Sequence, residues 1–135
     1  MNSTVVSVCH SVELVPLSEV LRFARFGPDV AVTLMSDRSD RIYIPGTVTV
    51  SATISEGIIN KKISFERSDM TPAAAMELES LASTRLICLY TDERGTRRVC
   101  GSPSWPLTLR FVDSGGAYQV SISGSDTATD GILSV

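Results

Sequence analysis

The sequence contains a single histidine, His10, and this scarcity limits the chemistry that the chain can offer. A zinc site needs several histidine or cysteine ligands at set spacings, and Cys9-His10 has no partner pair of the C-x-x-C type. A Ser-His-Asp or Cys-His catalytic arrangement would have to be built on His10, and no nucleophile-elbow motif is present. We therefore expect no catalytic residues, no metal and no cofactor, and a protein that is not an enzyme.

Other binding patterns are also missing from the sequence. Gly115-Gly116 is followed by neither a predicted helix nor a Lys-Ser/Thr pair, so it is not typical of a phosphate-binding loop. The acidic residues Asp37, Asp40, Asp92 and Glu93 lie at predicted turns, where the local backbone favours them. No residue has a catalytic partner that the sequence forces close.

Long apolar runs and an excess of positive charge are absent as well. No apolar run approaches the roughly 20 residues of a membrane helix, and the first nine residues do not have the pattern of a signal peptide. Twelve Lys and Arg against 15 Asp and Glu give a net charge of −3. A nucleic-acid-binding domain usually has a basic excess, and the basic run at 94–98 fits a solvated hairpin tip. We expect neither a nucleic acid nor a membrane as a partner.

Cysteine is sparse, and its number is odd. Three cysteines argue against a disulfide framework. The pattern predicts an intracellular protein with reduced thiols.

What the chain does have is alternation of apolar and polar residues, which is typical of β-strands. The clearest run is Thr47–Ser55, and the turn at Glu56-Gly57 joins it to a second alternating run, Ile59–Arg67. We predict a hairpin with one apolar face shared by both strands. The inward residues of the first strand are Val48, Val50, Ala52 and Ile54.

The first third of the chain is apolar but difficult to assign. Thr4–Cys9 and Val12–Val15 read as strands, and Pro16 interrupts the second of them. A polar loop is predicted at 36–41, and Pro45-Gly46 reads as a turn.

Ser18–Phe26 fits two structures. It can form a short helix with Ser18 as the N-cap, or an alternating strand. Gly27 and Pro28 would stop a helix after two turns, close to the minimum length. We favour a strand, because the neighbouring segment Asp29–Met35 is a clearer strand.

One helix is predicted at about 72–82. Thr71 is a good N-cap, and Pro72 fits the first helical position, where its missing N–H has no partner to lose. Ser68 or Asp69 could cap an earlier turn instead. The apolar stripe that packs on the sheet would consist of Ala74, Leu78, Leu81 and Ala82.

The run Leu86–Tyr90 is apolar on both faces, which indicates an interior strand covered on each side. Asp92-Glu-Arg-Gly95 fits a type I turn with Gly95 in the left-handed conformation. This turn sets Cys88 opposite Cys100 in the next strand. The two thiols are either a redox pair or small buried side chains, and we favour the second interpretation.

The remaining third continues the β pattern. Trp105, the only tryptophan, either covers the open end of a small core or anchors an exposed interface, and we favour the first. Strands are predicted at 107–111 and 118–122. We expect one domain at 1–124 and a flexible tail at 125–135.

These elements predict an α+β fold that is mainly antiparallel β, a β-sandwich or β-roll with one helix packed on the sheet. An uncharged row of hydroxyl side chains on the outer face of the Thr47–Ser55 strand suits self-association, because it carries no repelling charge. The candidate interface residues are Thr47, Thr49, Ser51, Thr53 and Trp105.

The second half of the chain, residues 58–124, resembles small proteins carried in prophages of Bacteroides-like bacteria. The shared pattern is an apolar strand, an Asp-x-x-Gly turn, a strand ending in Gly-Ser, a Pro-Leu strand, a Gly-rich turn and a closing strand. It is carried by Lys62-Ile-Ser-Phe-Glu-Arg, Leu86-Ile-Cys-Leu-Tyr-Thr-Asp-Glu-Arg-Gly, Gly101-Ser102, Pro106-Leu107, Gly115-Gly116, Tyr118 and Ser123-Gly124.

This resemblance implies a virion protein of the tail or the head–tail connection. Its partners would be copies of itself in a homo-oligomeric ring and other phage structural proteins, first in the cytoplasm of the bacterial host and then in the virion. The alternative is a β-sandwich module that binds a carbohydrate or a protein on Trp105, Tyr43 or Tyr118. An enzyme would need a pocket that gathers His10 or acidic residues with shifted pKa values.

Overall fold

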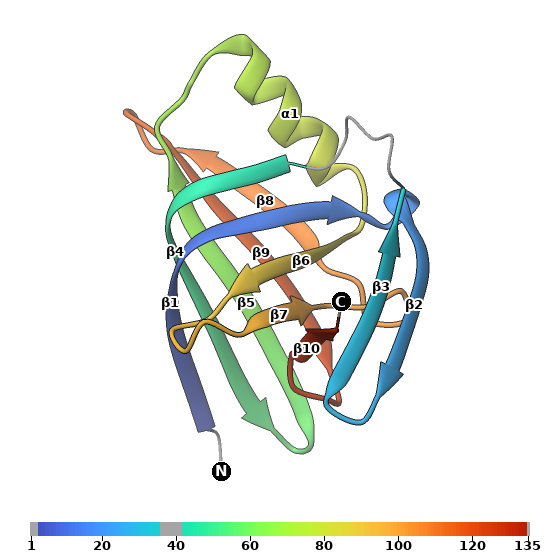
Figure 1. The fold of residues 1–135 in the computed structure, drawn as a ribbon. Coiled ribbons are helices and arrows are strands. Elements are labelled where there is room, and N and C mark those ends of the chain that lie inside the picture. The colour runs from blue at the N-terminus through green and yellow to red at the C-terminus, as the bar shows by residue number, and fades with distance from the viewer. Residues whose placement is uncertain (1–2, 36–41, 135) are drawn as a thin grey trace.

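A computed structural model describes residues 3–35 and 42–134, without the side chains of residues 3–7 and 134. The chain forms one ten-stranded sheet and one α-helix (Figure 1). The elements in chain order are β1 Ser3–Pro16, a 3₁₀ turn at Leu17–Glu19, β2 Val20–Phe26, β3 Asp29–Leu34, β4 Ile42–Ser55, β5 Ile58–Arg67, α1 Pro72–Ala82, β6 Leu86–Thr91, β7 Arg97–Cys100, β8 Thr108–Asp113, β9 Tyr118–Asp126 and β10 Gly131–Ser134.

The strand order is β2-β3-β10-β7-β6-β1-β4-β5-β9-β8. All neighbours are antiparallel except β10 and β3, which run parallel. The sheet curls until Leu107, just before β8, pairs with Leu86 at the start of β6, through two backbone N···O contacts of 2.8 and 2.9 Å. The strands β6, β1, β4, β5, β9 and β8 therefore close into a roll. β7, β10, β3 and β2 continue the sheet from β6 outside this roll. The α+β, mainly antiparallel β fold is confirmed.

Two hydrophobic cores lie on opposite faces of β6. The inner core fills the roll and includes Leu86, Cys88 and Tyr90 of this strand. The outer core lies between β6 and the β2–β3 pair and includes Ile87 and Leu89. The prediction of an interior strand covered on both sides is therefore confirmed. The buried residues of the inner core are Cys9, Val12, Leu14, Ile44, Val48, Val50, Ile63, Phe65, Leu78, Leu81, Leu86, Cys88, Tyr90, Cys100, Leu107, Leu109, Val120 and Ile122, and those of the outer core are Val15, Val30, Ile87, Leu89 and Val99.

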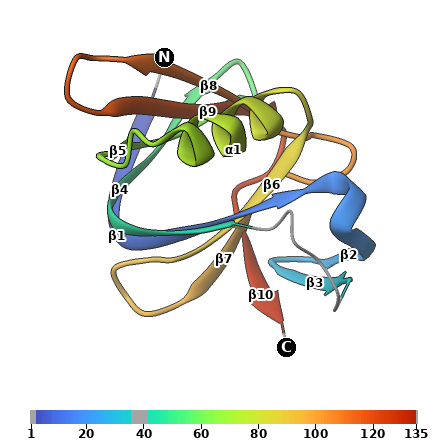
Figure 2. The same cartoon turned by 90° about the horizontal axis from the view of Figure 1, so that it is seen from above.

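The helix lies over one end of the roll. Figure 2 shows α1 beside β8 and β9 when the molecule is viewed from above, with the β2–β3 pair standing apart. Thr71 caps the helix, because its side-chain oxygen accepts a hydrogen bond from the Ala74 N–H at 3.3 Å. Leu78 and Leu81 are buried in the inner core, whereas the predicted fourth stripe residue, Ala82, is exposed.

The hairpin of β6 and β7 has the predicted register. Cys88 pairs with Cys100 and Leu89 with Val99. Gly95 has a φ of 83°, and its N–H donates to the Asp92 carbonyl at 3.0 Å. All three cysteines are buried free thiols, so Cys88 and Cys100 are not bonded to each other.

Three predictions about strand limits are wrong. Thr4–Cys9 and Val12–Val15 are one strand, β1, whose register against β4 shifts between Cys9 and Ser11. Pro45 lies inside β4 rather than in a turn. It lies opposite Ser11 of β1, next to the register shift, and before the pairing with β5 begins at Val48; proline in sheets is found at such irregular or unpaired positions.

The third error concerns the predicted tail. Residues 131–134 are not outside the domain but form β10, which lies between β3 and β7. The favoured strand at Ser18–Phe26 is confirmed as β2, after a short 3₁₀ turn. The predicted polar loop at 36–41 lies outside the described residues.

Candidate functional site

The hydroxyl row of the candidate interface lies on the outer face of β4. Thr47 is exposed, and Thr49, Ser51 and Thr53 are partly buried. β4 is flanked by β1 and β5, so this row is not a sheet edge and can meet a partner only with its face. The row continues across the neighbouring strands in register, as Thr49–Ser64–Ser121, Ser51–Lys62–Ser123 and Thr53–Asn60–Ser125.

Trp105 lies in a different place. Its side chain is 40% exposed, and it belongs to neither core, so the interpretation as a core cover is wrong. It lines a groove of about 390 Å³ together with Phe23 and Arg25 of β2, whereas Ser51 and Thr53 line another depression. The structure therefore does not bring the hydroxyl row and Trp105 into one site.

The groove beside Trp105 adjoins the free edge of the sheet. β2 is the last strand in the sheet order, so one side of its backbone has no strand partner among the described residues. Leu21 and Phe26 on this strand are exposed apolar side chains. Arg25 is fixed beside them, because its Nε donates to the Gly27 carbonyl and its Nη2 to the Thr129 carbonyl, each at 3.0 Å.

The opposite edge strand is better covered. β8 packs against α1, and the residue before it closes the roll by pairing with β6. Natural sheets commonly protect an edge in this way, since unpaired backbone groups can otherwise pair with another chain. Within the described parts of the chain no helix lies over the β2 edge, and in this it differs from the β8 edge (Figure 1).

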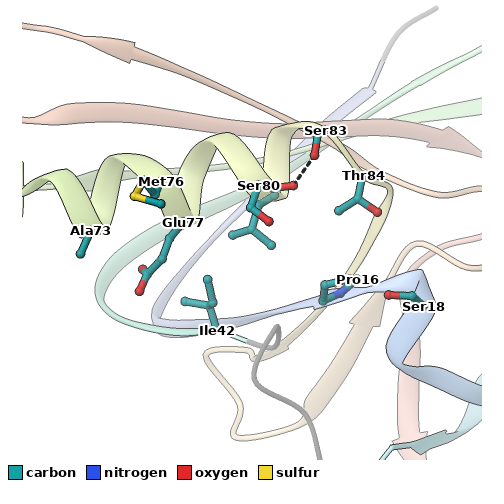
Figure 3. Close-up of a pocket in the computed structure, with 10 residues that line it drawn as sticks. Pro16, Ser18, Ile42, Ala73, Met76, Glu77, Ser80, Ser83 and Thr84 are labelled. Atoms are coloured by element: carbon teal, nitrogen blue, oxygen red, sulfur yellow. Dashed lines mark hydrogen bonds between the residues drawn. The ribbon is translucent and has the colours of Figure 1, made fainter.

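Another groove, of about 540 Å³, lies between α1 and the ends of β1 and β4 (Figure 3). Ile42 lies opposite Glu77 across it, and Pro16 lies opposite Thr84. Glu77 is engaged in an ion pair with Arg67 at 2.7 Å. The other polar side chains that line the groove are the uncharged hydroxyls of Ser18, Ser80, Ser83 and Thr84, and we place no site in it.

A buried polar cluster lies at the other end of the roll from α1. Lys61 of β5 is 4% exposed, and its Nζ lies 2.9 Å from Asp130 Oδ1 and 3.5 Å from Asp126 Oδ2. The Tyr90 hydroxyl donates to the other oxygen of Asp130. Arg98 Nη1 donates to the Asp130 carbonyl at 3.2 Å. We call Lys61, Tyr90, Arg98, Asp126 and Asp130 the Lys61 cluster.

The charge states of this cluster follow from its geometry. Burial lowers the pKa of Lys61, but the nearby Asp130 and Asp126 carboxylates outweigh it, so the net shift is upward from 10.5. Burial raises the pKa of Tyr90, and Asp130 raises it further. At neutral pH, Lys61 is therefore a cation and Tyr90 a neutral donor. Such groups hold a carboxylate in place; neither is prepared to act as a base or a nucleophile.

The sequence carried a signal for this cluster that the predictions did not use. In β5 the inward-facing residues are Ile59, Lys61, Ile63 and Phe65, all of which are buried. A lysine in the inward phase of an alternating strand is seldom buried without a partner. Its partners lie in the segment that was predicted to be a flexible tail.

The other residues considered for chemistry are dispersed. His10 is exposed on β1, and no group of three or more His, Cys, Asp or Glu that could hold a metal occurs within residues 3–35 and 42–134. Tyr43 is exposed on β4. Tyr118 is half-buried and makes an edge-to-face contact with Phe111, with the two ring centroids 5.5 Å apart. Tyr43, Tyr118 and Trp105 therefore have three separate surroundings. No helix in the described part of the chain is long and apolar enough to cross a membrane.

Comparison of the chain with protein-family models, with curated proteins and with solved structures found no match.

Proposed function

We propose that this protein is a non-enzymatic structural protein that assembles with further copies of itself through the free edge of β2. The observation that carries this proposal is the contrast between the two sheet edges. β8 is covered by α1, whereas β2 has no strand partner on one side among residues 3–35 and 42–134 and exposes Leu21 and Phe26. A second copy would supply backbone partners for this edge and remove both side chains from water.

The expected gain is large enough to matter for association. Full burial of a leucine or phenylalanine side chain stabilises a complex by about 1.5–3 kcal/mol. Edge arginines usually oppose strand pairing, but Arg25 is held by the Gly27 and Thr129 carbonyls. Arg22 is the other charged side chain on β2 and is exposed, and a second copy with a net charge of −3 can supply an acidic partner for it.

The biological setting rests on the resemblance of residues 58–124 to small prophage proteins. On that basis, we place the protein in a phage tail or head–tail connection, formed in the bacterial cytoplasm and carried into the virion together with other phage structural proteins. If β2 meets a different surface of the next copy, the contact is head-to-tail, and it gives a ring when the rotation closes.

The test is light scattering coupled to size-exclusion chromatography over a hundredfold range of protein concentration. We expect the mass of the wild-type chain to rise above 14.5 kDa with concentration. Phe26→Glu should reduce this rise in mass, because it places a charge on the apolar edge. Met76→Glu is the matched control, since Met76 on α1 is 69% exposed and Phe26 is 67% exposed.

Two results would count against the proposal. One is a wild-type monomer at every concentration that also fails to bind the other products of its gene cluster. The other is equal loss of association in the Phe26→Glu and Met76→Glu variants, which would assign the effect to charge alone rather than to the edge.

A binding module for a carbohydrate or a protein is the second candidate, favoured by the groove that Trp105 forms with Phe23 and Arg25. Tryptophan and arginine are enriched among residues that dominate binding. Because Trp105 is the only tryptophan, its fluorescence reports on this groove alone. A strict monomer whose fluorescence shifts on titration with a glycan or protein would move the assignment to this candidate.

A further inference from the structure

β10 occupies a slot that differs from every other position in the sheet. It is four residues long and lies between β3 and β7, parallel to the first and antiparallel to the second. It links the β2–β3 pair to the rest of the sheet, as the strand order shows. None of its strand partners is β9, the strand that precedes it, so β10 pairs only with strands far away in the sequence.

The slot recognises the start of this segment by charge. Asp130, just before β10, receives the Lys61 ammonium and the Tyr90 hydroxyl on its carboxylate and Arg98 on its carbonyl. Lys61 is buried, so its charge requires a carboxylate at this position. An occupant without an acid here would leave a buried ammonium with Asp126 at 3.5 Å as its one remaining carboxylate.

The next position of the slot has no room for a side chain. A Cβ atom on Gly131 would lie 2.1 Å from Val30 Cγ2, well inside van der Waals contact. Beyond it, the Ile132 N–H donates to the Pro28 carbonyl at 2.8 Å, and Leu133 packs against the outer core. The slot therefore accepts a strand of the form Asp-Gly-apolar-apolar.

We propose that this slot also takes β10 of a second copy of the chain, so that two molecules exchange their β10 strands. A second copy is the fitting occupant, because its own segment has the acid and the glycine that the slot requires. Exchange replaces each contact of β10 with an identical contact in the other molecule. The segment that changes its path is 127–129, between Asp126 and Asp130, and protein concentration sets the balance between the two forms.

This exchange is separate from the β2 edge and does not depend on it. β10 is short, and Ile132 and Leu133 are only partly buried, so its release exposes little apolar surface. Release also separates Asp130 from the buried Lys61 ammonium, which is costly. Exchange is therefore expected while the chain is folding, before β10 has docked, rather than by opening of the finished fold.

The first test uses two full-length variants with reversed charges, Lys61→Asp and Asp130→Lys, each also carrying Phe26→Glu to remove association through β2. Within either variant, and between copies of the same variant, like charges meet at the slot. When the two variants are mixed, each β10 finds an opposite charge in the other molecule. We expect a doubling of the mass from 14.5 kDa on mixing and no doubling for either variant alone.

The second test uses a cysteine pair in the otherwise wild-type chain and does not require the charge-reversed variants to fold. Ile132 pairs with Arg98 across β10 and β7, so Arg98→Cys with Ile132→Cys forms a disulfide within one chain or between two exchanged chains. The variant is refolded at rising concentration, oxidised, and examined on a denaturing gel without reductant. We expect the dimer fraction to rise with concentration, and each single-cysteine variant to remain monomeric.

Each outcome bears on the exchange. A mixed dimer, or a concentration-dependent covalent dimer that needs both cysteines, supports it. Disulfides formed only within single chains at every concentration would overturn it, whatever the charge-reversed variants do. Loss of association in Phe26→Glu concerns only the β2 edge, and absence of the two-cysteine dimer concerns only the exchange, so the two proposals can be tested separately.

Discussion

The two faces of β6 support two different parts of the molecule. The inner face is enclosed by the closed roll and by α1, and its residues Leu86 and Cys88 are fully buried. The outer face carries a much smaller core, which is covered by the β2–β3 pair and β10. Several residues of these covering strands, including Phe23, Val32 and Leu133, are only partly buried. Stability is therefore concentrated inside the roll, while the unpaired edge and the β10 slot belong to the layer outside it.

The largest predicted loss of stability comes from truncating Leu86 or Leu89, which lie on opposite faces of β6. Leu86→Ala should lower the free energy of unfolding by about 4 kcal/mol, and Leu89→Ala by about 2 kcal/mol, within the range for buried leucines. Leu86 is surrounded by a closed wall that cannot collapse into the cavity, whereas the thin layer over Leu89 can shift. Urea unfolding followed by circular dichroism measures both values. Equal losses would show that the outer layer packs as tightly as the roll.

The second prediction concerns the stability of the fold at high pH, which depends on Tyr90 in the inner core. The pKa of Tyr90 is raised by burial and by Asp130 from an ordinary value of 10.0. Above pH 10, the unfolded chain loses this proton while the folded chain keeps it, so the stability present below pH 10 falls as the pH rises. Tyr90→Phe should make this fall less steep by about 1.4 kcal/mol per pH unit.

The measurement for Tyr90 is urea unfolding at a series of pH values between 9 and 11. Tyr43→Phe is the control, because Tyr43 is exposed on β4. An unchanged slope in Tyr90→Phe would mean that the phenol ionises as readily in the folded state as in the unfolded one.

The smallest predicted effect is at the helix that closes the roll. Thr71→Ala removes the N-cap hydrogen bond to the Ala74 N–H and should destabilise the fold by about 1 kcal/mol. Leu78 and Leu81 still hold α1 on the inner core, so the helix should remain in place. Thermal unfolding checks the value, and Thr71→Ser should restore it. A loss as large as that of Leu86→Ala would mean that the cap, rather than the buried leucines, holds the helix.

Local signals in the sequence predicted much of the roll. The helix start was readable from Thr71-Pro72, because capping depends on adjacent residues. The register of β6 and β7 followed from the turn at Asp92–Gly95, which fixes the pairing of its own two strands. The alternation in β5 gave its inward face but not the partners of Lys61.

Long-range pairing decided what the sequence could not show. β10 pairs with β3 and β7, which are far away in the chain, and no pattern in Gly131–Ser134 predicts these pairing partners. Pro45-Gly46 resembles a turn in isolation, whereas in the fold it lies inside a strand, beside a register shift against β1 and before the pairing with β5 begins. Trp105 was placed beside β2 by the curl of the sheet, which the residues around it do not encode. Of the candidate site, the sequence identified Trp105 but neither the β2 edge nor the Lys61 cluster.

The insertion of β10 between two other strands also has a consequence for the order of folding. A strand that pairs on both sides can complete its hydrogen bonds only after β3 and β7 are in position, and pairings between distant parts of a chain form slowly. β10, and with it the β2–β3 pair that it links, should thus be the last part to join the sheet. Until it arrives, a newly folding chain presents an empty slot, and at high concentration during synthesis the first Asp-Gly segment to reach it can belong to a neighbouring chain.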